Sequence, residues 1–240
     1  MYPSGIIYNS KKSGSHGEVK LHATFMAKVL YGLLRGIGAG IIGFVIISFI
    51  FTFGPLFQQE VLYTTGSSSI SYKLSQTDLI NAQNTSVIQN EALNFGVNSY
   101  FSIVIPKIGA KANIIANVDS GNEAEYDKAL SEGVAHTKGT YFPGQGKNIF
   151  LFAHSTNAPW NVARFNAVFY LLDKMTKGDQ ILIYFADKRY IYTVTDTKIV
   201  GPNDTSYLNN KNNGEELILQ TCSPPGTSWN RLLVFAKLTN

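Results

Sequence analysis

Cysteine is almost absent from this sequence, because Cys222 is the only one in 240 residues. A chain with one cysteine has no internal disulfide, so no covalent cross-link within the chain holds its fold. Charged residues are also scarce, at 15% of the chain against 45% apolar residues. A chain of this length and composition can build a sizeable core, in one or two domains.

Charge is missing altogether from residues 36–57, GIGAGIIGFVIISFIFTFGPLF. A helix of this length would be about 33 Å long at 1.5 Å per residue, against about 30 Å for the hydrocarbon core of a bilayer. The uninterrupted apolar run is too long for a buried core helix. It also exceeds the apolar region of a cleaved secretory signal, which has about 7 to 15 residues, and no small-residue cleavage pattern follows it. We therefore predict one transmembrane signal anchor over 36–57.

The basic residues near this run indicate its orientation. Five Lys or Arg precede it within 1–35, whereas the next cation after it is Lys73. By the positive-inside rule, 1–35 is a cytoplasmic N-terminal segment and the rest of the chain is extracytoplasmic. From Val61 onward the charges nearly balance, with 15 Lys or Arg against 14 Asp or Glu. We therefore expect a single-pass protein of the cell membrane that contacts lipid through its anchor and has no nucleic-acid partner.

Aromatic and charged residues are rare in the stretch that follows the anchor. Residues 58–99 are rich in Ser, Thr, Asn and Gln instead. Such a composition buries little apolar surface, so we expect a polar stalk or linker here, with a short helix near 76–82.

From residue 100 the pattern changes to short β-rich runs separated by turn signals. A capping box of Asn122 and Glu125 predicts a short helix through Leu130. The runs expected to form strands are 102–106, 112–118, 148–155, a hairpin over 179–200 that turns at Asp187, and a second hairpin over 217–238. Many strands with only short helices between them favour a small barrel or sandwich over 100–240.

The last hairpin contains the cysteine, within LILQTCSPPGTSWNRLLVFAKL. Its first strand ends at Cys222, and its return strand begins at Arg231. Two prolines and a glycine make the loop between them stiff, so we expect the two side chains to face each other. A cation favours the thiolate, and guanidinium donors can hold an oxyanion. A buried cysteine acting as a small hydrophobe is the alternative interpretation.

A base would complete such a site. His16 and His22 precede the anchor, which leaves His136 and His154. His154 follows the apolar strand IFLFA and therefore lies at a sheet edge. On spacing alone, a structural role for His154 remains equally open.

Residues 100–238 resemble the sortases, membrane-anchored cysteine transpeptidases of bacterial surfaces. The family's signature Thr-Leu-x-Thr-Cys corresponds here to 218–222, with Ile218 in place of the first Thr. A Gly usually precedes the catalytic His, and Ala153 stands there instead. The stretches that carry the resemblance are IVIPKIGAKANI, GVAHTKGTYFPGQGKNIFLFAHS and LILQTCSPPGTSWNRLLVFAKL.

The resemblance implies a mainly β fold, a closed sortase-like β-barrel of about eight strands with short helices, preceded by one N-terminal transmembrane helix. It also implies that Cys222 is the nucleophile, His154 the general acid and base, and Arg231 the substrate-positioning and oxyanion group. Thr221 would line the substrate site beside the nucleophile. For His136 we favour a structural role. No cofactor is implied.

The resemblance further implies secreted protein substrates with an LPXTG-type sorting signal and an amine acceptor, either a peptidoglycan precursor or a surface protein. It leaves cell-wall anchoring and pilin linkage both open. The sequence shows no metal cluster, and scattered carboxylates such as Glu123, Glu125 and Asp127 give no support for a calcium site.

Two other classes of function are weighed against this one. An L,D-transpeptidase would have Gly directly before the Cys and Arg shortly after it, whereas Thr221 and the distant Arg231 stand here. A non-catalytic surface binding module would leave the Cys222 hairpin and His154 unexplained.

Overall fold

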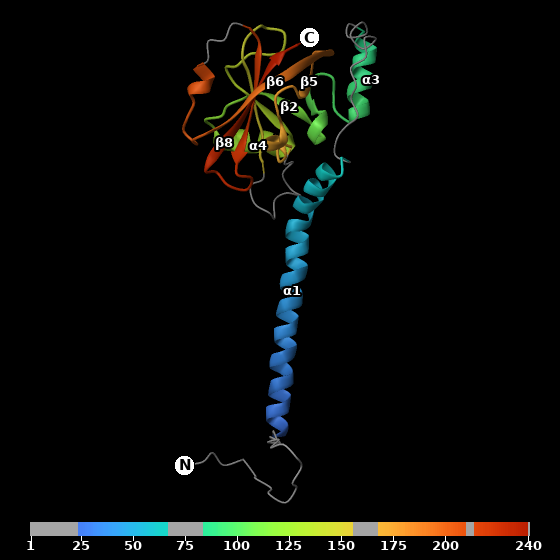
Figure 1. The fold of residues 1–240 in the computed structure, drawn as a ribbon, viewed down its shortest axis with the longest axis vertical. Coiled ribbons are helices and arrows are strands. Elements are labelled where there is room, and N and C mark those ends of the chain that lie inside the picture. Colours follow the sequence, from blue (N-terminus) through green and yellow to red (C-terminus); the bar gives the residue numbers. More distant parts are fainter. Residues whose placement is uncertain (1–23, 67–83, 156–167, 210–213, 240) are drawn as a thin grey trace, which may run out of the picture. The chain divides into compact units, whose positions relative to one another are not determined.

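The computed structural model describes residues 24–66, 84–155, 168–209 and 214–239 (Figure 1). The chain divides into two compact units, Met1–Phe51 and Thr52–Asn240. The described part of the first unit belongs to helix α1 (Phe25–Thr64), whose last turns belong to the second unit. Within α1, Phe25–Gly54 is long and apolar enough to cross a membrane, and the mean hydropathy reaches 2.3 over 18 of its residues.

The predicted anchor at 36–57 therefore lies inside a longer helix. Helix α1 begins at Phe25, so it includes Lys28 and Arg35, which we had assigned to the cytoplasmic segment. Lys and Arg are good helix formers whose long side chains can reach the membrane surface, so charge alone does not end a helix.

The second unit is built around a closed barrel of eight strands in the order β1-β2-β3-β4-β7-β8-β6-β5. This confirms the expected closed, mainly β fold. The pairs β2–β3 and β4–β7 are parallel, and the other neighbours are antiparallel. The strands are β1 (Phe101–Ile105), β2 (Ala110–Val118), β3 (Val134–Thr137), β4 (Ile149–Phe152), β5 (Gln180–Phe185), β6 (Lys188–Val200), β7 (Glu216–Ser223) and β8 (Asn230–Leu238).

Side chains alternate between the inside and the outside of the barrel. Along β4 and β7, Ile149, Leu151, Leu217 and Leu219 belong to the large buried cluster that fills the interior. The residues between them belong to a separate buried cluster on the outer face, formed by Phe150, Val200, Ile218 and Leu233. Ile218, the departure from the family signature, is therefore an outward apolar residue with its own packing partners.

Helix α3 (Thr85–Phe95) covers another part of the outer face (Figure 1). Its Ile88 and Ala92 are buried against strand residues that include Val104 and Leu182. Its Glu91 accepts hydrogen bonds from Arg189 Nη1 at 2.6 Å and from the Tyr184 hydroxyl at 2.7 Å. The structure thus differs from a stalk over this part of 58–99. The short helix expected near 76–82 lies outside the described residues.

The remaining helices are short. Helix α4 (Glu123–Glu132) begins where the capping signal predicts it, since the Asn122 side chain accepts a hydrogen bond from the Glu125 amide. The Glu125 carboxylate instead accepts from the Asp119 amide at 2.9 Å. Three single 3₁₀ turns complete the described elements: η1 (Pro106–Ile108), η3 (Leu172–Lys174) and η4 (Ser206–Asn209).

Candidate active site

Cys222 and Arg231 face each other across the last hairpin. They are direct partners in the β7–β8 ladder, one pair before Ser223 and Asn230 close it. Both side chains are partly exposed, and Cys222 is a free thiol. Arg231 Nη1 donates to the carbonyls of Ser228 at 3.1 Å and Asn230 at 3.2 Å, so the hairpin loop itself holds the guanidinium.

His154 comes to the same place through the parallel pairing of β4 with β7. Phe152 is paired with Gln220, and the next amide, that of Ala153, donates to the Gln220 carbonyl at 3.2 Å. Continuing this register by two residues places His154 beside Cys222. The elements that the sequence singled out are therefore neighbours at one edge of the barrel.

The three side chains also share one face. Ala153 belongs to the interior cluster, as Leu151 does, so His154 falls on the outward set. On β7, Cys222 has the same parity as the outward Ile218, and Arg231 is its direct partner on β8. We therefore infer that a thiol, an imidazole and a guanidinium meet at the ends of three adjacent strands, an arrangement that suits cysteine-based acyl transfer.

Thr221 points the other way, into the barrel. Its side chain is 3% exposed, and its hydroxyl donates to the Ala153 carbonyl at 2.9 Å. This bond ties the end of β7 to the residue before His154. The observed contact of Thr221 is therefore a tie between the two strands that carry the nucleophile and the base.

Helix α4 supplies charges to this site that the sequence patterns did not indicate. Burial lowers the pKa of His154 below its ordinary value, and the Asp127 carboxylate acts in the opposite direction. Burial raises the pKa of the neighbouring Tyr126, whose phenol also lies within the electrostatic influence of Arg231 and Cys222. No motif marks Tyr126 or Asp127, because their proximity depends on how α4 packs rather than on any local spacing.

His136 is engaged in local structure. It is fully buried, its Nδ1 accepts from the Asn117 amide at 3.3 Å, and its Nε2 donates to the Tyr141 carbonyl at 3.0 Å. Its ring also stacks on Phe142, with 4.5 Å between the centroids. Because one ring nitrogen accepts and the other donates, the imidazole is neutral, and burial lowers its pKa.

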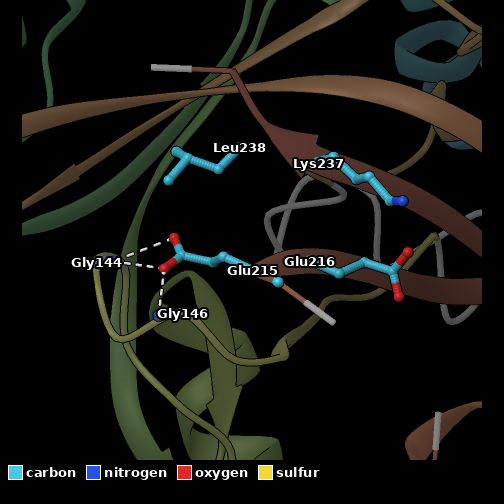
Figure 2. Close-up of a pocket in the computed structure, with 7 residues that line it drawn as sticks. Gly144, Gly146, Glu215, Glu216, Lys237 and Leu238 are labelled. Carbon is cyan, nitrogen blue, oxygen red and sulfur yellow. Dashed lines mark hydrogen bonds between the residues drawn. The ribbon is translucent and has the colours of Figure 1, made fainter. Parts of the chain in front are cut away.

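A second polar cluster lies at the opposite end of β7. Glu215, just before the strand, is 9% exposed and lines a cleft of about 480 Å³. Its carboxylate accepts hydrogen bonds from the amides of Gly144 at 2.9 Å and Gly146 at 2.8 Å (Figure 2). It also accepts one from the Tyr192 hydroxyl. Sequence reasoning missed this residue. Across the part of the chain that the structure describes, no group of three or more His, Cys, Asp or Glu could hold a metal ion.

Comparisons with known proteins identify a family for the barrel unit. The Sortase domain model matches residues 103–239. Sortase D of Bacillus subtilis (strain 168) is 31% identical over 136 residues, which are 55% of this chain and 60% of that protein. The match thus spans less than two thirds of that relative's length.

Solved structures are similar as well. Sortase C-1 from Actinomyces oris is 25% identical with a TM-score of 0.50, over 71% of this chain and 84% of that one. The pilus-related sortase C of Group B Streptococcus is also 25% identical with a TM-score of 0.50, over 70% of this chain and 92% of that one. The Sortase domain match covers more than half of the sequence and includes His154, Cys222 and Arg231, and this chain therefore belongs to the sortase family.

Proposed function

We propose that this chain is a cysteine transpeptidase that cleaves an LPXTG-type sorting signal near the C-terminus of secreted proteins and transfers the acyl group to an amine. The observation that supports it most directly is the strand register, which pairs Cys222 with Arg231 and brings the end of β4, two residues before His154, alongside β7. Family membership leaves the L,D-transpeptidase alternative without support.

In the first step, the Cys222 thiolate attacks the carbonyl carbon of the Thr-Gly peptide bond. The carbon–nitrogen bond breaks, and the His154 imidazolium gives its proton to the departing amine. The product is a thioester between Cys222 and the substrate's threonine. Arg231 stabilises the negative charge that develops on the carbonyl oxygen, because its guanidinium is held at the same edge by the loop carbonyls.

In the second step, an amine acceptor attacks the thioester. His154 takes the proton that the amine loses, a new amide bond forms, and the Cys222 thiolate leaves. Water attacking in place of the amine gives hydrolysis, so peptidase activity is the expected side reaction. A peptidoglycan precursor and a surface protein such as a pilin are both suitable acceptors, since each offers a primary amine.

The reaction needs thiolate and imidazolium together. In general, a thiol has an ordinary pKa near 8.5 and an imidazole one of about 6.5, so thiolate and imidazolium rarely coexist at neutral pH. Burial of His154 lowers its pKa and makes this coexistence rarer, whereas Asp127 opposes this effect. We therefore expect a bell-shaped dependence of kcat/KM on pH that belongs to the coupled pair.

The membrane helix fits this function. We propose that α1 anchors the chain in the cell membrane with its N-terminus in the cytoplasm, so that the barrel meets secreted substrates outside. Protease digestion of sealed vesicles tests the orientation. A protease added on the side that digests the barrel should leave 1–35 intact, and digestion of 1–35 from that side would contradict the proposed orientation.

The direct test uses the full chain in detergent, because α3 packs on the barrel and a truncated chain beginning at residue 100 would lack it. A quenched-fluorophore library of Leu-Pro-x-Thr-Gly peptides is offered with and without an amine acceptor, alongside Cys222→Ala. Cleavage that the variant loses, with transfer of the acyl half to the amine, is the expected result. If no library member is cleaved and Cys222 is inert to thiol reagents, the chain keeps the fold as a non-catalytic module.

A further inference from the structure

Part of the connection between β6 and β7, the turn η4 (Ser206–Asn209), packs on the outer face that carries the candidate active site. In this connection, the single turn η4 contains Tyr207, whose ring is partly buried against the outer cluster of Phe150, Val200, Ile218 and Leu233. The ring stacks on Phe150, with 5.8 Å between the centroids and an interplanar angle of 24°. Phe150, Ile218 and Leu233 belong to β4, β7 and β8, the strands that lead to or carry His154, Cys222 and Arg231.

A hydrogen bond fixes Tyr207 close to the nucleophile. Its hydroxyl donates to Gln220 Oε1 at 2.6 Å. Gln220 and Cys222 are two residues apart on β7, so both face outward and lie roughly 7 Å apart along the strand. Gln220 also occupies the variable position of the Thr-Leu-x-Thr-Cys signature, where the family does not prescribe a residue.

The turn is also held from within. Asp204 accepts a hydrogen bond from the Ser206 amide at 2.9 Å, which shapes the chain just before Tyr207. Burial raises the pKa of the Tyr207 phenol, and the charges of Arg231 and Asp204 act on it in opposite directions. Tyr207 therefore lies within the electrostatic influence of Arg231, and its hydrogen bond to Gln220 attaches the turn to β7.

We propose that Tyr207 is a positioning residue for the acyl-donor peptide: through its hydrogen bond to Gln220 it holds the turn at 204–207 as a fixed wall beside Cys222 and Arg231. The inference rests on the proposed transpeptidase function. A wall that is ordered before the peptide arrives spares the peptide the cost of ordering it, so losing the bond weakens binding. The chemical step involves other groups and should be unaffected.

A purely structural role makes a different prediction. If Tyr207 only fills the outer cluster, its ring matters and its hydroxyl does not. Tyr207→Phe keeps the ring over Phe150 and removes only the bond to Gln220. Gln220→Met removes the acceptor from the other side while keeping the length of the side chain.

The experiment measures steady-state kinetics of the full chain in detergent with the best sorting peptide, for Tyr207→Phe, Gln220→Met and the double variant. The matched control is Tyr100→Phe, because Tyr100 is 75% exposed. For each single variant we expect KM to rise about three- to tenfold with kcat unchanged, as for one lost hydrogen bond. The double variant should match the singles, because both remove the same bond.

Hydrogen exchange of the same proteins separates this inference from the proposed function. Amides of 204–208 should exchange faster in Tyr207→Phe than in wild type and in Tyr100→Phe. An unchanged KM, or a fall in kcat of the same size as the rise in KM, overturns the inference. If wild type cleaves no peptide, the proposed function fails, and the exchange rates alone decide whether Tyr207 holds the turn.

Discussion

The two ends of strand β7 are built for different purposes. At its start, the nearly buried Glu215 carboxylate receives two backbone amides and the Tyr192 hydroxyl. At its end, Cys222 is partly exposed, next to a loop whose Pro224 and Pro225 are exposed. Hydrogen bonds that are already satisfied stabilise a fold, whereas a reacting group must stay accessible. The stabilising carboxylate of Glu215 and the thiol of Cys222 are thus about seven residues apart along the chain.

The two histidines of the barrel extend this comparison. His136 belongs with the Glu215 end, because it binds the Tyr141 carbonyl of the same loop that Glu215 holds at Gly144 and Gly146. His154 belongs with the Cys222 end. The sequence presents both as a histidine near a short strand, and only their partners distinguish them.

The largest effect should come from His154→Gln. We expect kcat/KM for peptide cleavage to fall about 10²- to 10⁴-fold, because the general acid is lost, with little change in the melting temperature. His136→Gln should do the reverse, lowering the melting temperature while the folded fraction keeps most of its activity. Peptide kinetics and thermal unfolding of both variants measure this. Equal effects of the two variants on both properties would break the distinction between the ends of β7.

Glu215→Ala should affect stability next most strongly. Removing the carboxylate leaves two amides and a buried hydroxyl without their acceptor, so we expect a loss of about 2 to 5 kcal/mol in the free energy of unfolding. Urea unfolding at pH 7 measures it, with the exposed Glu132→Ala as the control. Activity per folded molecule should stay within about twofold, because the active groups are at the other end of the strand. A stable but inactive Glu215→Ala would show that the two ends are coupled.

Acid should weaken the fold in part through His136. Burial lowers the pKa of His136 in the fold below 6.5, so the unfolded chain binds a proton first as the pH falls. Its contribution to stability is therefore complete above pH 6.5 and is lost below it. His154 is shifted in the same direction and adds to the effect. Urea midpoints between pH 7.5 and 5 should fall less steeply in His136→Gln than in wild type, and parallel slopes would remove His136 as a cause.

Strand patterns and local signals made much of this architecture predictable. The capping box at Asn122 located α4, and the Pro- and Gly-rich loop located the hairpin that pairs Cys222 with Arg231. Helix α3 was missed because its sequence is mostly polar. Only two of its residues, Ile88 and Ala92, are buried, so it has little apolar periodicity. The early start of α1 was missed because its basic residues do not interrupt the helix.

Three residues with notable contacts could not be predicted from the sequence, for a common physical reason. Tyr126, Tyr207 and Glu215 act through contacts with residues far along the chain, and such contacts leave no periodicity or motif. Tyr207 reaches Gln220 only because η4 folds back on β7, and Glu215 reaches Gly144 across 71 positions. Cys222, His154 and Arg231 could be proposed from the sequence because the family resemblance and the strand ends both point to them.

The smallest effect sharpens the comparison at the Cys222 end alone. The Asp127 charge favours the imidazolium of His154, so Asp127→Asn should lower the pKa of His154 further. Asp127 is exposed, and solvent screens its charge, so we expect kcat/KM at neutral pH to fall only about twofold. NMR titration of the His154 ring protons measures the pKa directly, with His136 in the same spectrum as the internal control. If the two histidines shift equally, Asp127 acts through the overall charge of the protein. If His154 alone shifts, α4 supplies a local charge that favours the protonated form of the general acid, and the chemistry at this end of β7 depends on a helix from a distant part of the sequence.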